Sequence, residues 1–440
     1  MGELSMKKTV IFLLTSIIFL SILTPMTCFA EYNDSLDIRA DIACMICMDN
    51  DEAVFNKNYN KRTAPASLTK IMTALVALEK CEDLTAPVTI SQYAIDSLVG
   101  TDSSTAGLVP GEKVTMYDLL NCLMVKSANE AAIAIAEYVG GSVPAFLEMM
   151  NKKAKEIGCT GTNYVNVHGL DQEGQYTTAR DLYLICKEAM KNPVFEKIVG
   201  QTSYTMPATN MNEERILPAT NLMINSNYAD CYLPYVTGIK TGTTDDAGRC
   251  IITKASKNGY NYIAIIMGAD TKDAYNGEIA ENIAFIECRK MIDWTFSNIR
   301  YKVVAEENEI VTVVDVKYSW AADSLELVPS KDVAALVPSS LDSSSVLIQP
   351  NTDTPEVIKA PVKKGEKVGT ATVYYAGKEI ATVELVASKT LSRSLILTIG
   401  GAVEAAWNSV AGKIIFVLLV LLGAGYAGFV IYTKKNSKRR

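Results

Sequence analysis

The C-terminal end of the chain carries the feature that most limits how it can fold: the run Ile414–Tyr432 contains no charged side chain. As a helix at ~1.5 Å per residue, this run spans roughly 28 Å, close to the ~30 Å hydrocarbon core of a bilayer. Residues 433–440 carry five Lys or Arg side chains, and such a basic flank predicts a cytoplasmic end. We therefore predict a transmembrane helix at 414–432 and a basic cytoplasmic tail at 433–440. A buried core helix is the alternative. The terminal position of the run and its basic flank disfavour that alternative.

The N-terminal segment, residues 1–30, has the parts of an export signal. Lys7 and Lys8 precede an apolar run that ends near Leu23, and Ala30 is a small residue at a plausible cleavage point. An uncleaved anchor is the alternative. We therefore expect a single-pass protein of the cell membrane, with a C-terminal anchor and its body on the extracellular side. The net charge is −7 and both predicted ends are positive, so the body is strongly acidic, which argues against a nucleic-acid partner.

Between these ends, a length of 440 residues predicts two folded units. In residues 31–300, strand-like runs at both ends enclose helical patterns, which predicts a mixed α/β domain. In residues 301–389, short alternating runs separated by turn residues predict a small all-β domain. Residues 390–413 are apolar with few charges, and we expect an amphipathic helical connector near the bilayer.

Apolar periodicity also predicts individual elements of the first domain. The predicted strands are a pair within 38–54, with a turn at 49–51, and single strands at 235–240, 249–255 and 260–267. The predicted helices begin after Ser67 and cover 116–139, 144–157, 179–190 and 273–296.

Three short strings in this domain supply hydroxyl and amine groups: Ser67–Lys70, Ser127–Asn129 and Lys240–Gly242. Ser67 at a helix start and Lys70 three residues later lie on one helix face. An unprotonated lysine can act as the general base that activates a serine nucleophile. The helix dipole, partial burial and a second cation such as Lys240 all lower the pKa of that lysine. A Ser-x-x-Lys string alone also fits a surface helix.

The second string follows an apolar run, in a loop or at a helix start. The Ser127 hydroxyl can relay a proton to a leaving amine, and Asn129 can orient Lys70 and a substrate carbonyl. An ordinary helix N-cap serine is the structural alternative for Ser127.

The third string stands at the end of a predicted strand, which as an edge strand would pair with an extended peptide. Gly242 lets a ligand approach closely. The backbone N–H groups of Ser67 and Thr243 can form an oxyanion hole. The amine of Lys240 and the hydroxyls of Thr241 and Thr243 suit a terminal carboxylate. A solvated strand end is the structural alternative.

Taken together and in this order, the strings resemble those of the penicillin-binding serine acyltransferases. More closely, the chain is similar to the low-molecular-mass D-alanyl-D-alanine carboxypeptidases of peptidase family S11. The supporting strings cover nearly the whole body between the two ends, at 64–74, 129–132, 168–171, 177–182 and 360–369.

This resemblance implies a catalytic domain of the penicillin-binding and β-lactamase fold, followed by the small all-β domain. It implies removal of the terminal D-alanine from peptidoglycan stem pentapeptides through an acyl-enzyme on Ser67. It also implies acylation by β-lactam antibiotics, whose ring mimics D-Ala-D-Ala. No cofactor is expected, and with one His and no Cys-His cluster we expect no metal site.

Two positions depart from the family pattern. Thr243 follows the Lys-Thr-Gly string, where members often carry His. The better-known members bind the substrate carboxylate with an Arg about ten residues before a Trp, and that position before Trp294 is Ala284. Arg289 is five residues further along the helix and should face elsewhere. Arg249 is a candidate to compensate, and recognition of the carboxylate otherwise rests on Lys240, Thr241 and Thr243.

Several other interpretations stay open at this stage. His168 is predicted to be structural, with a catalytic role as the alternative. Cys44 and Cys47 have the spacing of a redox motif, and we interpret them as part of an apolar strand. A β-lactamase of the same fold and a non-catalytic scaffold that binds the cell wall are the rival functions.

Overall fold

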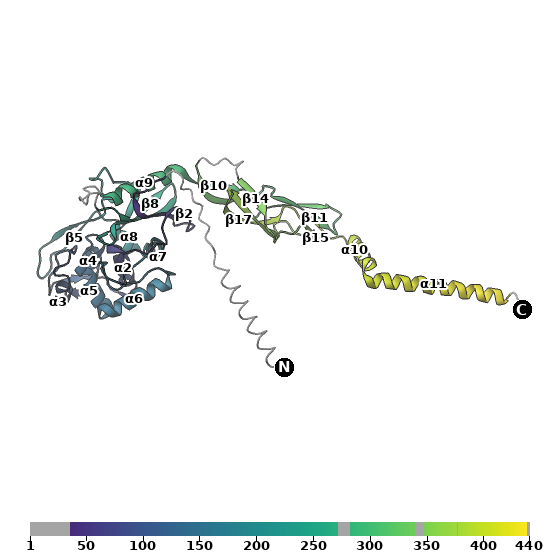
Figure 1. Ribbon diagram of the computed structural model, residues 1–440, viewed down its shortest axis with the longest axis horizontal. Coiled ribbons are helices and arrows are strands. Elements are labelled where there is room, and N and C mark those ends of the chain that lie inside the picture. The colour runs from purple at the N-terminus through teal and green to yellow at the C-terminus, as the bar shows by residue number, and fades with distance from the viewer. Residues whose placement is uncertain (1–35, 272–281, 340–345, 376, 438–440) are drawn as a thin grey trace, which may run out of the picture. The chain divides into compact units, whose positions relative to one another are not determined.

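The computed structural model describes residues 36–271, 282–339, 346–375 and 377–437, and the chain divides into two compact units between Arg300 and Tyr301 (Figure 1). The predicted export signal at 1–30 lies outside the described residues. Each unit has its own hydrophobic core. The first unit is mixed α/β and the second is all-β with two C-terminal helices, so the predicted fold class is confirmed.

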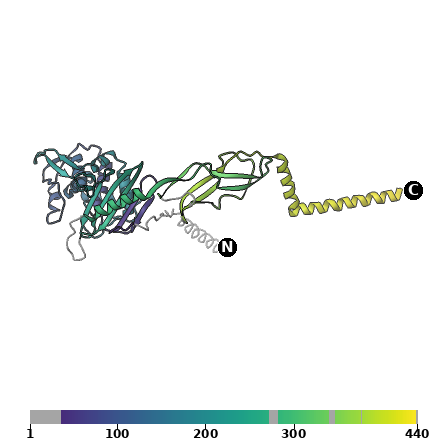
Figure 2. The same cartoon turned by 90° about the horizontal axis from the view of Figure 1, so that it is seen from above.

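The first unit is built on a five-stranded antiparallel sheet with strand order β2-β1-β9-β8-β7. Its strands are β1 (Ala40–Cys47), β2 (Ala53–Lys57), β7 (Val236–Thr244), β8 (Gly248–Lys257) and β9 (Tyr260–Ala269). Figure 2 shows the purple N-terminal strands beside the green strands from 236–269. The three strands predicted at 235–240, 249–255 and 260–267 are therefore present, and β7 lies at an edge of the sheet.

Both faces of this sheet are covered. Helix α9 (Ile283–Asn298) packs on β8, β9 and β1, while the other helices lie on the opposite side (Figure 1). Side chains of a strand alternate between the two faces. Accordingly, Ile263, Ile265 and Met267 of β9 join the core that the helices form. Cys44 belongs to the same core, so β1 is the apolar strand that the sequence predicted, and both Cys44 and Cys47 are buried free thiols.

Helix α2 (Thr69–Lys80) is the central helix of this core. Its residues from Thr69 to Ala77 are all buried, because apolar side chains such as Ile71, Met72 and Val76 face its neighbours on all sides. Those neighbours are α4 (Met116–Met124), α5 (Asn129–Gly140), α6 (Val143–Glu156), α7 (Ala179–Ala189) and α8 (Pro193–Val199). Burial of α2 on every side carries Lys70 into the interior.

Smaller elements complete the first unit. They are η1 (Ala66–Leu68), β3 (Pro87–Thr89), α3 (Gln92–Asp96), β4 (Lys113–Thr115), β5 (Ser203–Met206), β6 (Arg215–Pro218) and η2 (Leu222–Ile224). β3 pairs with β4, and β5 with β6, both antiparallel.

Several predicted boundaries are wrong. The second strand of the pair predicted within 38–54 is β2, which continues to Lys57. β8 and β9 continue to Lys257 and Ala269, two residues beyond their predicted ends. The predicted helix at 116–139 is broken into α4 and α5, because the backbone N–H of Asn129 donates to the Ser104 carbonyl instead of continuing a helical ladder. Ser127 lies in the break with a left-handed φ of 67°. The predicted strand at 235–240 continues to Thr244, because its pairing with β8 extends to Gly248. The first part of the predicted helix at 273–296 lies outside the described residues.

The second unit contains a six-stranded sheet of order β14-β16-β17-β12-β11-β15 and a separate pair, β10 and β13. The strands are β10 (Ile299–Ala305), β11 (Thr312–Lys317), β12 (Ser324–Pro329), β13 (Val333–Pro338), β14 (Val346–Pro350), β15 (Val357–Lys359), β16 (Lys367–Tyr375) and β17 (Lys378–Ala387). Alternate residues such as Leu325, Leu327, Val383 and Leu385 form its core.

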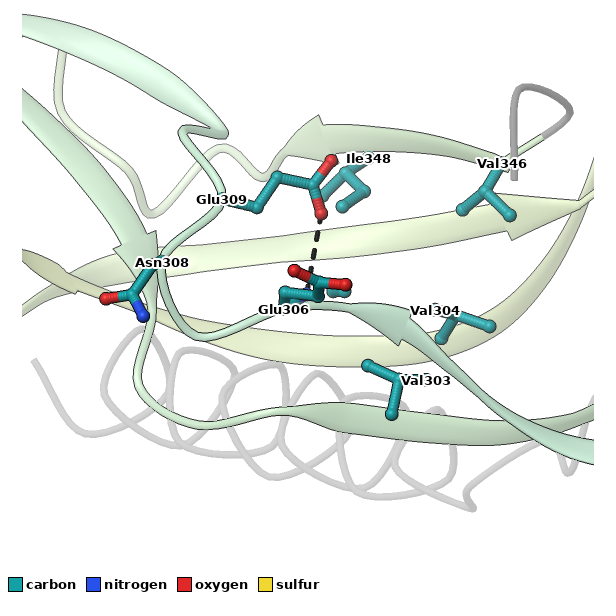
Figure 3. A pocket seen from close by; sticks show the side chains of 8 residues that line it. Val303, Val304, Glu306, Asn308, Glu309, Val346 and Ile348 are labelled. Carbon is teal, nitrogen blue, oxygen red and sulfur yellow. Dashed lines mark hydrogen bonds between the residues drawn. The ribbon is translucent and has the colours of Figure 1, made fainter.

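A hollow of about 450 Å³ opens in this unit between β10 and β14. Figure 3 shows it lined by Val303, Val346 and Ile348 together with Glu306 and Glu309. None of the residues that line it comes from the three sequence strings. The site that those strings predict therefore has to be sought in the first unit.

Two helices end the described chain, α10 (Leu395–Asn408) and α11 (Val410–Ser437). The segment Val410–Ile431 of α11 is long enough and apolar enough to cross a membrane. Helix α10 exposes large apolar side chains, among them Leu395, Ile396 and Trp407. Such exposure is costly in water, whereas it is favourable at a lipid surface.

Candidate active site

The three sequence strings converge on one cavity of about 300 Å³ in the first unit. Its walls come from η1, the break between α4 and α5, the 168–171 loop, the edge strand β7, Cys250 of β8 and the start of α9. The predicted site residues that line it are Ser67, Ser127, Asn129, Thr241, Gly242 and Thr243. Lys70 and Lys240 are buried beside it, with 0% and 1% of their surface exposed.

Ser67 lies in the tight turn η1, immediately before α2. Two glycines allow other backbone segments to press against this turn. A Cβ atom on Gly169 would lie 1.8 Å from the Ala66 carbonyl oxygen, and one on Gly242 would lie 3.0 Å from the Ser67 nitrogen. The sequence predicts that Gly242 lets a ligand approach closely. The structure shows that it is also needed for β7 to pass the Ser67 turn.

Lys70 is surrounded by three oxygen atoms. Its Nζ atom lies 2.8 Å from the Ser67 hydroxyl, 2.6 Å from Asn129 Oδ1 and 2.7 Å from the His168 carbonyl oxygen. Burial lowers the pKa of Lys70 well below its usual range, and the Lys240 amine lowers it further, against the opposing effect of Glu130. A neutral amine has two N–H donors and one lone pair. In that form it can donate to the two carbonyl-type oxygens and keep its lone pair for the Ser67 hydroxyl proton, whereas the ammonium form donates to all three oxygens.

Asn129 is the first residue of α5 and binds on both sides of its amide. Its Oδ1 accepts from Lys70, and its Nδ2 donates to the Ser103 hydroxyl at 2.9 Å. Ser127 lies two residues earlier, where its left-handed backbone turns the chain between α4 and α5. The structure therefore joins Ser67, Lys70 and Asn129 by direct hydrogen bonds and places Ser127 on the wall of the same cavity.

The Lys240 string runs along the edge strand β7. The Lys240 amine donates to the Thr241 carbonyl at 2.8 Å, and burial lowers its pKa to about 7. The Thr241 hydroxyl donates to the Thr220 hydroxyl at 2.6 Å, and the Thr243 hydroxyl donates to the Gly242 carbonyl at 2.9 Å. Thr220 lines the cavity and was not predicted, since it lies in a connecting segment with no recognisable motif.

The loop that contains His168 forms another wall. The backbone carbonyl of His168, not its ring, accepts from Lys70, and its ring Nδ1 accepts from the Leu170 N–H at 3.2 Å. Burial lowers the pKa of His168 to about 3, so the ring is neutral near pH 7. Asp171 ties this loop to the end of β7, because its carboxylate accepts from the Thr244 hydroxyl at 2.7 Å and the Asp246 N–H at 3.0 Å.

Two arginines near the site, Arg289 and Arg249, lie in different surroundings. Arg289 donates to the carbonyls of Ala229 and Asp230 at 2.9 and 2.8 Å, so it faces away from the cavity as predicted. Arg249 stands opposite Thr243 in the pairing of β7 with β8. It lines an adjoining cavity of about 400 Å³ that shares Thr243 and Thr244 with the first.

A buried lysine that is hydrogen-bonded to a serine, on this fold, defines a serine-type acyl-transfer hydrolase of the penicillin-binding class. Residues 29–271 match the family model described as D-alanyl-D-alanine carboxypeptidase, and residues 300–393 match that of the penicillin-binding protein 5 C-terminal domain. The chain belongs to the D-alanyl-D-alanine carboxypeptidase family, which confirms the resemblance drawn from the sequence strings.

Curated relatives match most of the chain. D-alanyl-D-alanine carboxypeptidase DacF of Bacillus subtilis is 30% identical over 82% of this chain and 88% of its own length. DacC of Escherichia coli is 30% identical over 90% of this chain and 94% of its own length.

Solved structures agree with this assignment. Penicillin-binding protein 5 from Haemophilus influenzae has a TM-score of 0.60 at 26% identity, over 82% of this chain and all of its own. The Streptomyces K15 DD-transpeptidase has a TM-score of 0.54 at 27% identity, over 60% of this chain and 99% of its own.

Replacing Gly169 by Ala should disable the site through the backbone. The added Cβ would overlap the Ala66 carbonyl oxygen, so the Ser67 turn has to move, and a displacement near 1 Å can lower a rate by ~10²-fold. We expect at least that loss in the rate at which labelled penicillin acylates the full-length protein. Gly174→Ala is the matched control, because Gly174 also has a positive φ but a Cβ there would make only an ordinary contact with Val165. Equal acylation rates in the two variants would contradict the role of the Gly169 contact.

Proposed function

We propose that Ser67 is the nucleophile and Lys70 the general base of a carboxypeptidase that removes the terminal D-alanine from peptidoglycan stem pentapeptides. The observation that carries this proposal is the Lys70 amine, buried and with a lowered pKa, at 2.8 Å from the Ser67 hydroxyl. A lowered pKa increases the share of the neutral amine, which is the form that acts as a base, and its contact with the hydroxyl gives the proton a direct path.

The reaction then follows from the positions of these groups. Lys70 takes the Ser67 proton as Oγ attacks the carbonyl carbon of the D-Ala–D-Ala peptide bond. The bond to the leaving nitrogen breaks as Ser127 relays a proton to it, and free D-alanine departs. Water, deprotonated by Lys70, then attacks the ester on Ser67, and the proton returns to the serine oxygen. We assign the oxyanion hole to the N–H groups of Ser67 and Thr243, because β7 passes close to the Ser67 nitrogen at Gly242.

The edge strand supports the proposed mode of substrate binding. Among the described strands, only β8 pairs with β7, so the other side of β7 can pair with an extended stem peptide through backbone hydrogen bonds. Lys240, Thr241 and Thr243 bind the terminal carboxylate in this proposal, and Arg249 supplies the additional positive charge. β-Lactam antibiotics would acylate Ser67 in the same cavity.

We further propose a location that matches this substrate. The export signal at 1–30 carries the body across the membrane, α11 anchors it through 414–432, and the basic tail at 433–440 stays in the cytoplasm. The catalytic domain 31–300 and the β domain 301–389 then lie outside the cell membrane, where peptidoglycan is. The connector 390–413 contains α10, whose exposed apolar side chains suit the membrane interface.

Replacing Ser67 by Ala tests the proposed function itself. The full-length protein should release D-alanine from a peptide ending in D-Ala-D-Ala and form a long-lived adduct with labelled penicillin. Ser67→Ala should abolish the adduct and lower D-alanine release by ~10³-fold or more, because no nucleophile remains. Rapid turnover of penicillin by the unmodified protein would instead support a β-lactamase. If the unmodified protein neither becomes labelled nor releases D-alanine, the result would support a non-catalytic scaffold.

The pKa of Lys240 predicts how substrate capture depends on pH. Its pKa of about 7 means that the positive charge is present below that pH and is lost as pH rises through it. The pH dependence of kcat/KM reports the ionisation of groups in the free enzyme. For a peptide with a terminal carboxylate, kcat/KM should therefore fall above about pH 7. Lys240→Arg keeps the charge at every pH tested and should move this decline to higher pH. An unchanged decline in Lys240→Arg would contradict the role of Lys240.

Arg249→Ala tests the proposed carboxylate contact. A charge-assisted hydrogen bond contributes ~1.5–3 kcal/mol, so KM for a peptide with a free terminal carboxylate should rise by roughly 10-fold or more. The same peptide with an amide in place of the carboxylate should be affected far less. Arg289→Ala is the matched control, because Arg289 binds the carbonyls of Ala229 and Asp230. A loss that is equal for both peptides would exclude recognition of the carboxylate by Arg249.

A further inference from the structure

A buried carboxylate that the proposed reaction does not use lies behind the site. Glu130 is the second residue of α5, and only 1% of its surface is exposed. Its Oε1 accepts from the backbone N–H of Ala106 at 2.6 Å. Its Oε2 is also buried, and within the described part of the chain it has no hydrogen-bond partner. A buried carboxylate is costly unless it is paired and hydrogen-bonded, so this position calls for an explanation.

Glu130 accepts a hydrogen bond from segment 103–106. The same segment also makes hydrogen bonds with Asn129. The Ser103 hydroxyl accepts from the Asn129 side chain at 2.9 Å, and the Ser104 carbonyl accepts from the Asn129 backbone N–H at 2.9 Å. The Ser104 hydroxyl donates to the Lys126 carbonyl at 2.8 Å. The bond from Ala106 to Glu130 therefore fastens the end of this segment to the first turn of α5. Asn129, held in this way, presents its Oδ1 to Lys70 at 2.6 Å.

We propose that Glu130 is a positioning residue for Lys70: it clamps segment 103–106 onto α5, which fixes the Asn129 amide, and it places a negative charge beside the buried amine. This inference rests on the proposed role of Lys70 as the general base. The position near the N-terminus of α5 favours the charged form of the carboxylate, because the helix dipole is positive there.

The charges around Lys70 give this role a measurable consequence. The Lys240 amine of β7 and the Glu130 carboxylate of α5 act on the charge of Lys70 from opposite directions, and the neutral His168 belongs to the loop whose backbone carbonyl accepts from Lys70. Lys240 lowers the pKa of Lys70 and Glu130 raises it. Burial raises the pKa of Glu130 itself, while nearby backbone N–H groups and Lys70 oppose that rise. Removing the negative charge should let Lys70 lose its proton at lower pH.

Glu130→Gln separates the effect of the negative charge from the effect of the hydrogen bond to segment 103–106. Gln keeps an oxygen acceptor for the Ala106 N–H, so segment 103–106 can stay in place, whereas the charge is gone. In the full-length protein, the acidic limb of the rate of acylation by labelled penicillin should move to lower pH. Glu130→Ala removes the charge and the acceptor together, so it should show the same shift and in addition a maximal acylation rate that is ~10-fold or more lower, because Asn129 loses its support.

Glu137→Gln is the matched control. Glu137 lies on the same helix, about 10 Å along its axis, and its carboxylate accepts from the Ser91 hydroxyl. The substitution makes the same change of net charge and should leave the acylation profile unchanged. Melting temperatures of all variants show whether they fold.

A Glu130→Gln profile that superimposes on that of the unmodified protein overturns the inference, whether or not Glu130→Ala folds. An equal shift in Glu137→Gln also overturns it, because the effect would then be one of net charge alone. These outcomes differ from failure of the proposed function, in which Ser67→Ala still becomes labelled or the unmodified protein does not.

Discussion

The structure of the site depends on the burial of one amine, that of Lys70. A charged ammonium in the core would be costly, and the surrounding oxygens reduce this cost only in part. A neutral amine can be fully satisfied there, because Asn129 Oδ1 and the His168 carbonyl lie within reach of its two N–H groups and the Ser67 hydroxyl within reach of its lone pair. The fold thus favours the protonation state that can take a proton from Ser67.

Each of these oxygens comes from a different part of the chain, and the fold must bring them together. Helix α2 carries Lys70 into the core, α5 supplies Asn129, and the 168–171 loop supplies a backbone carbonyl. Gly169 and Gly242 let their segments approach the Ser67 turn more closely than a side chain would allow. Asp171 then ties the loop to the end of β7. The result is a cavity bordered by an edge strand that can bind a peptide.

Much of this arrangement could be predicted from the sequence, and what could not be predicted is mostly non-local. Apolar periodicity identified α2, the β1–β2 pair and the all-β second domain, because this pattern is formed by residues that are close together in the sequence. The helix at 116–139 was predicted without its break, since the Ser104 carbonyl that takes the Asn129 N–H lies 25 residues earlier. The contact from His168 involves a backbone atom, which has no signature in the residue type. Glu130 was noticed only as part of a family string, and its buried contact emerged from the structure.

The central claim is tested most directly by a titration of the Lys70 side chain itself. NMR of the full-length protein with isotope-labelled lysine follows the charge on each amine, and Lys70→Gln identifies the signal of Lys70. The account predicts that Lys70 loses its proton well below the ordinary lysine value of ~10.4, while surface lysines titrate near it. A Lys70 signal that titrates together with the surface lysines would contradict the account.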